Sequence, residues 1–272
     1  MKLGAYKGLF LWFVFSCLPI CQSQPIENNR NQTSNQKAEK DCLINVGWSE
    51  WKPYQYLGKD GRVAGYQINL LDLIGAKMGC QMVYRQQTDW QSSVESLKTQ
   101  HIDLIGNASF TKNRLKYFYF SNTYREELLV LYVKAELLPS YKNRSLTELL
   151  TDGFKLGIVA GAEYNTADTG FLTNRRFDNN IIRVKDSISY ISKMEKGIID
   201  GFFEDPLVHE NRVMNQTMPF ELSIYPIEIR LGPIFFMFSK STRNQNLIPK
   251  FNAALKKVNT EYPLMFEWFE QK

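Results

Sequence analysis

The chain has 272 residues, a length that accommodates one large domain or two ordinary ones. Hydrophobic residues make up 44%, aromatic residues 14% and charged residues 22% of the sequence, which are values typical of globular proteins. This composition excludes a fibrous, a wholly disordered and a multi-span membrane protein. The formal net charge is +5, but no cluster of Lys and Arg is interleaved with aromatic residues, so we expect no nucleic-acid partner.

The amino terminus has the pattern of an export signal over residues 1–23. Lys2 and Lys7 form its positive region, 9–20 is apolar, and Ser23 is a small residue at a cleavable edge. The apolar stretch is shorter than the about 20 residues that span a bilayer. We therefore expect a cleaved signal peptide and an exported protein.

Two features near this signal qualify that expectation. Cys17 is an alternative lipid-attachment site, although Phe15 fits the lipidation motif poorly. Residues 24–41 contain a single strong apolar residue, Ile26, and cannot bury enough surface to order themselves. We expect this segment to be a flexible leader.

Strand and helix patterns alternate from residue 43 onward. The elements expected first are a strand at 43–46, a helix at 68–78, a strand at 81–84, a helix at 90–97 and a strand at 102–105. Gly79 should end the first helix, and Thr88, three residues before Gln91, should cap the second. This βαβαβ order predicts parallel strands.

The same order returns in the second half of the chain. Its expected elements are a strand at 156–159, a helix at 164–173, a strand at 181–184, a helix at 188–196 and a strand at 198–203. The third strands begin alike, with Ile-Asp at 102–103 and Ile-Asp at 199–200, each after an amphipathic helix. Coincidence is the alternative explanation, because Asp is common where strands begin.

Extended apolar stretches lie between and after these halves. They are 128–133 and 232–238, and they are followed by a helical pattern at 248–258 and a final short helix at 262–269. The economical arrangement has the chain cross to a second lobe near Arg125 and return near Arg230. Lobe 1 would then hold 42–124 and 231–272, lobe 2 would hold 125–230, and the two crossings would make a hinge.

Two cysteines remain beyond the leader, Cys42 and Cys80, and an exported compartment allows them to pair. Each opens a predicted strand, and parallel neighbours bring their starts together, which favours a disulfide. The alternative is two buried free thiols. No CxxC motif is present for redox chemistry.

In open α/β sheets, ligands lie beyond the carboxyl ends of the strands. The segments that follow the predicted strands are 47–54, 106–114, 160–164 and 204–206, and all of them would line one cleft if the lobes face each other. Arg114 could hold a carboxylate through two parallel hydrogen bonds, with Ser109 and Asn107 adding more. Asp205, on the opposite lobe, could accept from a ligand ammonium, and this polarity selects a zwitterion.

Further candidates are Trp48, Trp51 and Glu163. The two tryptophan rings, together with that of Tyr54, could offer a flat apolar or cation–π surface, and Glu163 could recognise a ligand side chain or amine. Each has a plainer explanation, because aromatic clusters more often form core and Glu163 would suit the first turn of a helix. Similarly, Arg114 could be a solvated surface residue, and Asp205 before Pro206 has the pattern of a helix N-cap.

Several segments together carry a family resemblance. They are Ile-Asn-Val-Gly-Trp at 44–48, Pro-Tyr at 53–54, Gly-Tyr-Gln-Ile-Asn-Leu at 65–70, Ile-Asp-Leu-Ile-Gly-Asn-Ala-Ser-Phe-Thr-Lys-Asn-Arg at 102–114, Phe-Ser at 120–121 and Gly-Ile-Ile-Asp at 197–200. Over nearly all of 43–272 the chain resembles the family 3 solute-binding proteins, the periplasmic amino-acid receptors of ABC importers. The resemblance implies an α/β fold of two Rossmann-like lobes with a hinge, the type II periplasmic binding protein or venus-flytrap fold.

The resemblance also implies roles for single residues. Arg114 matches the arginine that clamps the ligand carboxylate, Ser109 a supporting hydroxyl, Asp205 the acid that takes the ammonium, and Trp51 an aromatic cover. The chain departs from the family pattern at Gln67 and Asn69, where acids are usual, and near Ala162 and Glu163, where a serine or threonine is usual.

The expected function is capture of a small amino-acid-like solute by hinge closure and its delivery to the permease of an ABC importer. We expect a monomer without cofactor or metal. One alternative is a dehydratase-like enzyme with Glu163, Glu204 or Asp205 as its acid, although no GxSxG, HExxH or P-loop motif occurs. Another is a ligand-sensing module that acts in trans on a membrane receptor.

Overall fold

A computed structural model describes residues 42–162, 164, 170, 172, 174–215 and 217–263. They belong to one compact unit, Lys40–Lys272. The predicted signal peptide, Cys17, the leader, Glu163, most of the expected helix 164–173 and nearly all of the final helix lie outside the described residues.

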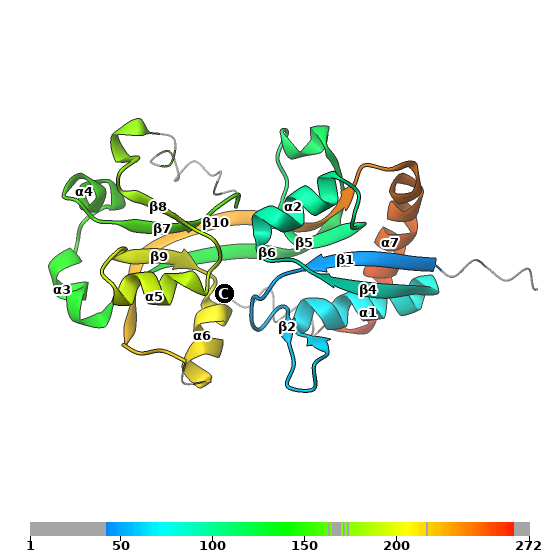
Figure 1. Cartoon of the computed structure of the whole chain (residues 1–272), viewed down its shortest axis with the longest axis horizontal. Coiled ribbons are helices and arrows are strands. Elements are labelled where there is room, and N and C mark those ends of the chain that lie inside the picture. Colours follow the sequence, from blue (N-terminus) through cyan, green and yellow to red (C-terminus); the bar gives the residue numbers. More distant parts are fainter. Residues whose placement is uncertain are drawn as a thin grey trace, which may run out of the picture. The chain divides into compact units, whose positions relative to one another are not determined.

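The fold is built on an eight-stranded mixed sheet in the order β4-β1-β5-β10-β6-β9-β7-β8 (Figure 1). Its strands are β1 (Cys42–Trp48), β4 (Cys80–Gln86), β5 (Leu104–Ser109), β6 (Phe118–Lys134), β7 (Leu156–Val159), β8 (Ile181–Val184), β9 (Gly201–Glu204) and β10 (Leu222–Ser239). The short strands β2 (Tyr56–Leu57) and β3 (Val63–Ala64) form a separate hairpin. The helices are α1 (Tyr66–Met78), α2 (Trp90–Lys98), α3 (Leu138–Tyr141), α4 (Leu146–Thr151), α5 (Ser189–Glu195), α6 (Pro206–Met214) and α7 (Thr242–Glu261).

The two ends of the sheet repeat one arrangement. β1 pairs in parallel with β4 and β5, and β7 pairs in parallel with β8 and β9, as the alternation in the sequence predicts. We call β4-β1-β5, with α1, α2, α7 and the loops beside these elements, the first half. We call β8-β7-β9, with α3, α4, α5, α6 and the loops beside them, the second half. The antiparallel pair β6 and β10 joins them, because β10 borders β5 and β6 borders β9. The stretches expected at 128–133 and 232–238 are parts of these two long strands.

Each half has its own apolar core. In the first half α1 and α7 pack on one face of the sheet around Leu70, Ile74 and Phe251, and α2 covers the other face around Leu97 (Figure 1). In the second half one cluster gathers around Leu150 and another around Tyr190, Met194 and Phe202. The site therefore rests on two separately packed bodies that share β6 and β10.

Two helix ends that the sequence marks most clearly are confirmed, whereas α7 begins six residues before the expected helix at 248–258. Gly79 takes a left-handed conformation with φ 68° and ends α1 as predicted, because glycine adopts positive φ without steric cost. Asp205 is the N-cap of α6, with Pro206 in its first turn. The prediction for α2 was wrong by one residue: Asp89, not Thr88, is the N-cap, and it forms a reciprocal capping box with Ser92.

The third strand of each half begins later than expected, and the two delays have the same cause. The carboxylate of Asp103 accepts the backbone N–H of Asn45 at 2.8 Å, and that of Asp200 accepts the N–H of Lys155 at 2.8 Å. In both places a side chain takes the N–H that a strand would otherwise bond. The similar strand starts are thus structurally equivalent rather than coincidental.

The predicted disulfide is present. Cys42 and Cys80 are register partners at the starts of β1 and β4 and are bonded, with their Cα atoms 4.5 Å apart. The bond fixes the outer edge of the first half, at the opposite end of these strands from the site described below.

Candidate functional site

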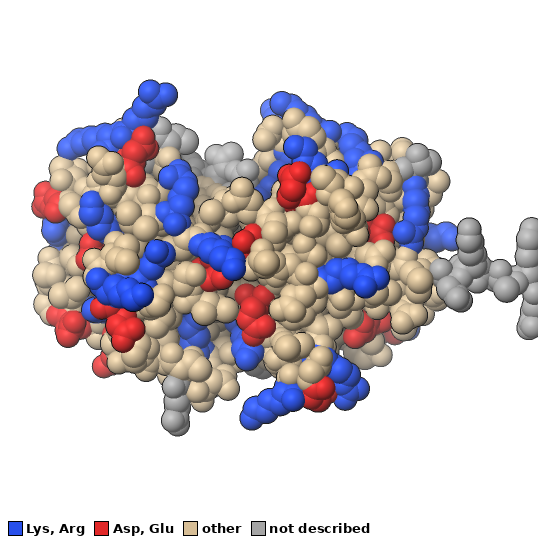
Figure 2. Space-filling view, in the orientation of Figure 1, with Lys and Arg blue, Asp and Glu red and all other residues tan. Residues whose placement is uncertain are grey.

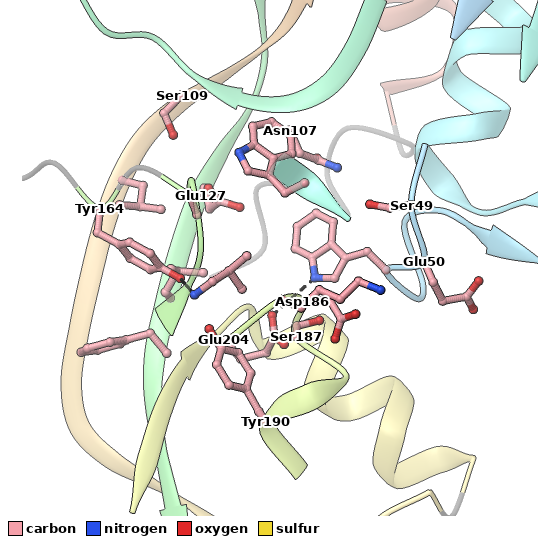
Figure 3. Close-up of a pocket in the computed structure, with 18 of the residues that line it drawn as sticks. Ser49, Glu50, Asn107, Ser109, Glu127, Tyr164, Asp186, Ser187, Tyr190 and Glu204 are labelled. Atoms are coloured by element: carbon pink, nitrogen blue, oxygen red, sulfur yellow. Dashed lines mark hydrogen bonds between the residues drawn. The ribbon is translucent and has the colours of Figure 1, made fainter. Parts of the chain in front are cut away.

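A pocket opens at the carboxyl ends of the strands, where residues of both halves meet (Figure 3). The first half contributes Ser49, Glu50, Trp51, Gln55, Trp90, Asn107, Ser109 and Arg114. The second half contributes Val159, Ala162, Tyr164, Lys185, Asp186, Ser187, Tyr190, Phe203 and Glu204, and the joining strands add Glu127, Leu129 and Leu231. All four segments singled out in the sequence therefore reach this pocket, together with 185–187 and the joining strands.

Arg114 is held between the two halves. Its side chain is buried at 7% exposure, and its guanidinium donates to the carbonyl of Ser109 at 2.9 Å and to the carbonyl of Gly161 at 3.2 Å. The guanidinium also lies 5.4 Å from the ring centroid of Trp90, within cation–π range. A planar donor group in this position can hold a carboxylate within the pocket.

Asn107 and Ser109 lie beside Arg114 at the end of β5. Asn107 has φ 57°, in the left-handed region that asparagine tolerates better than most residues. Its Oδ1 accepts from Arg125 Nη2 at 3.2 Å and lies 2.9 Å from the hydroxyl of Tyr124. These contacts fix the wall of the pocket next to the guanidinium.

The two tryptophans have different positions. Trp51 lines the pocket, stacks on Tyr54 with 4.4 Å between ring centroids, and points its Nε1 at Glu204 Oε1, 3.5 Å away. Trp48 is the last residue of β1, is buried at 4% exposure, and does not line the pocket. For Trp48 the packing explanation fits, because its ring belongs to the core rather than to the pocket surface.

Asp205 is also absent from the pocket lining. Its Oδ1 accepts the backbone N–H of Leu207 at 2.8 Å, and its Oδ2 accepts the hydroxyl of Tyr54 at 2.8 Å. The same oxygen lies 3.8 Å from Arg125 Nη1. The structure thus brings Arg114, Ser109, Asn107 and Trp51 together around the pocket and places Asp205 behind its wall, while Glu163 lies outside the described residues.

Two buried acids line the pocket, each backed by an arginine. Glu127 pairs with Arg125 at 2.8 Å, and Glu204 pairs with Arg212 at 3.1 Å. Burial raises the pKa of both carboxyl groups above the ordinary value, although the neighbouring guanidinium groups act in the opposite direction. The walls therefore present carboxylates on which a cationic group would favour the ionised form.

Sequence reasoning assigned no ligand contact to Glu127 or to the segment 185–187. Charged residues at 125–127, beside the apolar run 128–133, are a signal that could have found the former. The latter follows β8, the middle strand in sequence order of the second half, and the rule on carboxyl ends of strands applies to it equally.

On the face drawn in Figure 2, basic and acidic side chains are interspersed, and both signs lie side by side near the middle.

Within the described part of the chain, no group of three or more His, Cys, Asp or Glu side chains could hold a metal ion. None of the helices described there combines the length and the apolar character needed to cross a membrane. Among the described residues, the pocket thus has aromatic and aliphatic side chains in its lining, one buried guanidinium on its first-half wall and carboxylates on other walls.

Comparison with known proteins identifies the family. The sequence profile of the bacterial extracellular solute-binding proteins, family 3, matches residues 44–271. The chain belongs to this family. Its members are binding proteins, and the expected type II periplasmic binding protein fold is confirmed. No curated protein shows significant sequence similarity to the chain.

Solved structures of the same fold include amino-acid-binding proteins and a sensor domain. An ancestral arginine-binding protein bound to arginine has a TM-score of 0.68 and 20% identity, with 84% of this chain and 97% of that chain covered. A periplasmic binding protein of Salmonella typhimurium with high arginine specificity has a TM-score of 0.66 and 19% identity, with 84% and 99% covered. A histidine kinase sensor domain has a TM-score of 0.68 and 14% identity, with 85% and 96% covered.

Proposed function

We propose that the protein binds a small amino-acid-like solute in the pocket between its two halves. The observation that carries the proposal is Arg114, a buried guanidinium that lines the pocket from the first half and contacts Gly161 of the second. Family membership supports it, as do solved structures of the same fold, an ancestral arginine-binding protein bound to arginine and to glutamine.

Binding would couple to closure of two lobes. We propose lobe 1 as 42–124 with 231–272 and lobe 2 as 125–230, with hinge crossings near Arg125 and Arg230. A ligand that converts an open-to-closed ratio of 99:1 into 1:99 must favour the closed form by about 5.5 kcal/mol. Contacts made on both halves at once can supply this preference, because they exist only in the closed form.

The proposed setting is an exported, monomeric receptor that delivers its solute to the permease of an ABC importer. The predicted signal peptide and the extracellular character of the family support export. A second candidate is sensing in trans, which the histidine kinase sensor domain among the structural neighbours favours. Capture of a permease or of a receptor kinase by the ligand-loaded protein would separate these two roles.

Thermal-shift screening of the purified, exported protein tests the binding proposal. The probes are the twenty amino acids, polyamines and small carboxylates without an amine. A ligand present at 100 times its Kd stabilises the native state by about 2.7 kcal/mol and raises Tm accordingly. We expect at least one amino acid to raise Tm and to show saturable calorimetric binding. A screen in which no amino acid does so would reject the proposal.

A further inference from the structure

Two acids stand next to each other where β9 ends and α6 begins. Glu204 is the last residue of β9, and Asp205 is the N-cap of α6. Both are buried, at 3% and 6% exposure, and both belong to the second half. Because neighbouring side chains in an extended segment point in different directions, the two carboxylates have different surroundings.

Both oxygens of Asp205 are occupied by contacts within the protein. Oδ1 satisfies the first turn of α6 through Leu207 N–H, which is the ordinary role of an N-cap acid. Oδ2 accepts from Tyr54 of the first half at 2.8 Å. This second bond joins the two halves directly and involves no ligand.

Glu204 faces the pocket instead. Its Oε2 accepts from Arg212 at 3.1 Å, and its Oε1 accepts the N–H of Asp205 at 3.1 Å. The remaining contact, from Trp51 Nε1 to Oε1, is 3.5 Å long and therefore weak. An ionised carboxylate offers about four acceptor positions, so Glu204 has capacity for a donor that enters from the pocket (Figure 3).

Trp51 makes this point of the wall suited to a cation. Its ring comes from the first half and its Nε1 reaches Glu204 of the second, so a carboxylate and an aromatic ring meet at one place in the pocket. An ammonium group there would gain an ion pair with Glu204 and a cation–π contact with the ring. Glu127, the other buried acid that lines the pocket, lies within β6 and is paired with Arg125 at 2.8 Å.

We propose that Glu204 is the carboxylate that receives the ammonium group of the ligand, and that Asp205 joins the two halves through Tyr54 in the closed form without contacting the ligand. The inference rests on the proposed function and refines it. It moves the role that the family resemblance gives to Asp205 onto its neighbour. Burial raises the pKa of Glu204, and an adjacent ammonium would stabilise its ionised form.

Matched substitutions and matched ligands test this division of roles. Glu204→Gln and Asp205→Asn keep the size of each side chain and remove its charge. The probes are L-arginine and L-glutamine, each compared with the analogue that lacks only the α-amino group, 5-guanidinopentanoate and glutaramate. Isothermal calorimetry gives the ratio of the two Kd values for each protein, and this ratio isolates recognition of the ammonium.

We expect Glu204→Gln to weaken amino-acid binding by roughly 10- to 100-fold and to leave the affinity for the des-amino analogue nearly unchanged. We expect Asp205→Asn, and likewise Tyr54→Phe, to weaken both ligands by the same factor, because these changes act on closure. Circular dichroism checks that each variant is folded, and Glu204→Asp, which keeps the charge, should restore part of the amino-acid preference.

Three results would overturn the inference. If Asp205→Asn weakened binding of the amino acid but not of its des-amino analogue, Asp205 would be the residue that receives the ammonium group. This result would hold even if Glu204→Gln failed to fold. Equal loss of both ligands in Glu204→Gln would make Glu204 a structural residue. A wild-type protein that binds neither amino acid nor any other in the screen would reject the proposed function as well, which distinguishes the two failures.

Discussion

The two halves of the molecule share one topology, but the buried charges that they contribute to the pocket lining have opposite signs. The first half presents the guanidinium of Arg114 together with Trp51 and Trp90, whereas the second half presents the carboxylate of Glu204. In each half these groups come from the carboxyl end of a parallel strand or from the segment that follows it. The comparison shows that a repeated scaffold fixes where a side chain is presented, while the residues after each strand decide which pole of a ligand it meets.

The halves also differ in how their outer strands are tied together. In both, an Asp carboxylate before the third strand accepts a backbone N–H, from Asn45 in one and Lys155 in the other. Only in the first half are the starts of the paired strands bonded covalently, between Cys42 and Cys80. The corresponding register pair at the start of β7 and β8 is Leu156 and Ile181.

The largest effect should come from removing the positive pole in the first half. Arg114→Ala would leave a ligand carboxylate unpaired in the pocket, so we expect amino-acid affinity to fall by about 2 to 5 kcal/mol. Calorimetry with the amino acid found in the screen measures it. Lys185→Ala is the matched control, because Lys185 lines the pocket from the second half on an exposed position, and its loss should cost under about 1 kcal/mol. Equal losses would erase the asymmetry between the halves.

The next effect concerns the covalent tie. The disulfide closes a loop with a sequence separation of 38, and the double change Cys42→Ser with Cys80→Ser should lower the free energy of unfolding by about 2 to 4 kcal/mol. Denaturant titration measures the change. Ligand affinity should hardly alter, because the bond lies at the far end of β1 and β4 from the pocket. An unchanged midpoint would show that the first half needs no more than its apolar core.

The smallest effect is a pH dependence from the second half. Burial raises the pKa of Glu204, and protonation would remove the charge that pairs with an ammonium. Amino-acid affinity should therefore fall as pH falls through this raised pKa, by at most about tenfold per pH unit for one proton. Calorimetry at a series of pH values compares wild type with Glu204→Gln. Glu127, whose pKa burial also raises, titrates in both proteins, so only the difference reports Glu204. Identical profiles would contradict the assignment.

Local rules in the sequence predicted much of the fold. The strands at 156–159 and 181–184 have the predicted bounds. The first lies between Lys155 and the small residues Ala160 and Gly161, and the second, Ile-Ile-Arg-Val, lies between Asn180 and Lys185. The carboxyl-terminal end of α1 and the start of α6 followed from Gly79 and from the Asp205–Pro206 pair. The disulfide followed from topology, since parallel neighbours bring Cys42 and Cys80 together.

Other features depend on contacts between segments far apart in the chain. The long strand β6 includes the buried charged residues Arg125 and Glu127, which pair with each other, and Arg125 also bonds Asn107. No sequence pattern shows that Tyr54 will bond Asp205, 151 residues away. For the same reason the sequence could not separate the roles of Glu204 and Asp205, whose surroundings are fixed by β6, α6 and the loop after β1.

One backbone carbonyl has a consequence for selectivity among solutes. Gly161 O accepts hydrogen bonds from two first-half donors, Trp90 Nε1 at 2.9 Å and Arg114 Nη2 at 3.2 Å. A carboxylate that arrives at this guanidinium competes with an acceptor already in place, so its gain is an exchange of partners rather than a wholly new bond. A neutral acceptor such as an amide or an alcohol resembles the carbonyl of Gly161, so replacing that carbonyl would add little binding free energy. An anion would still gain electrostatic attraction to the guanidinium.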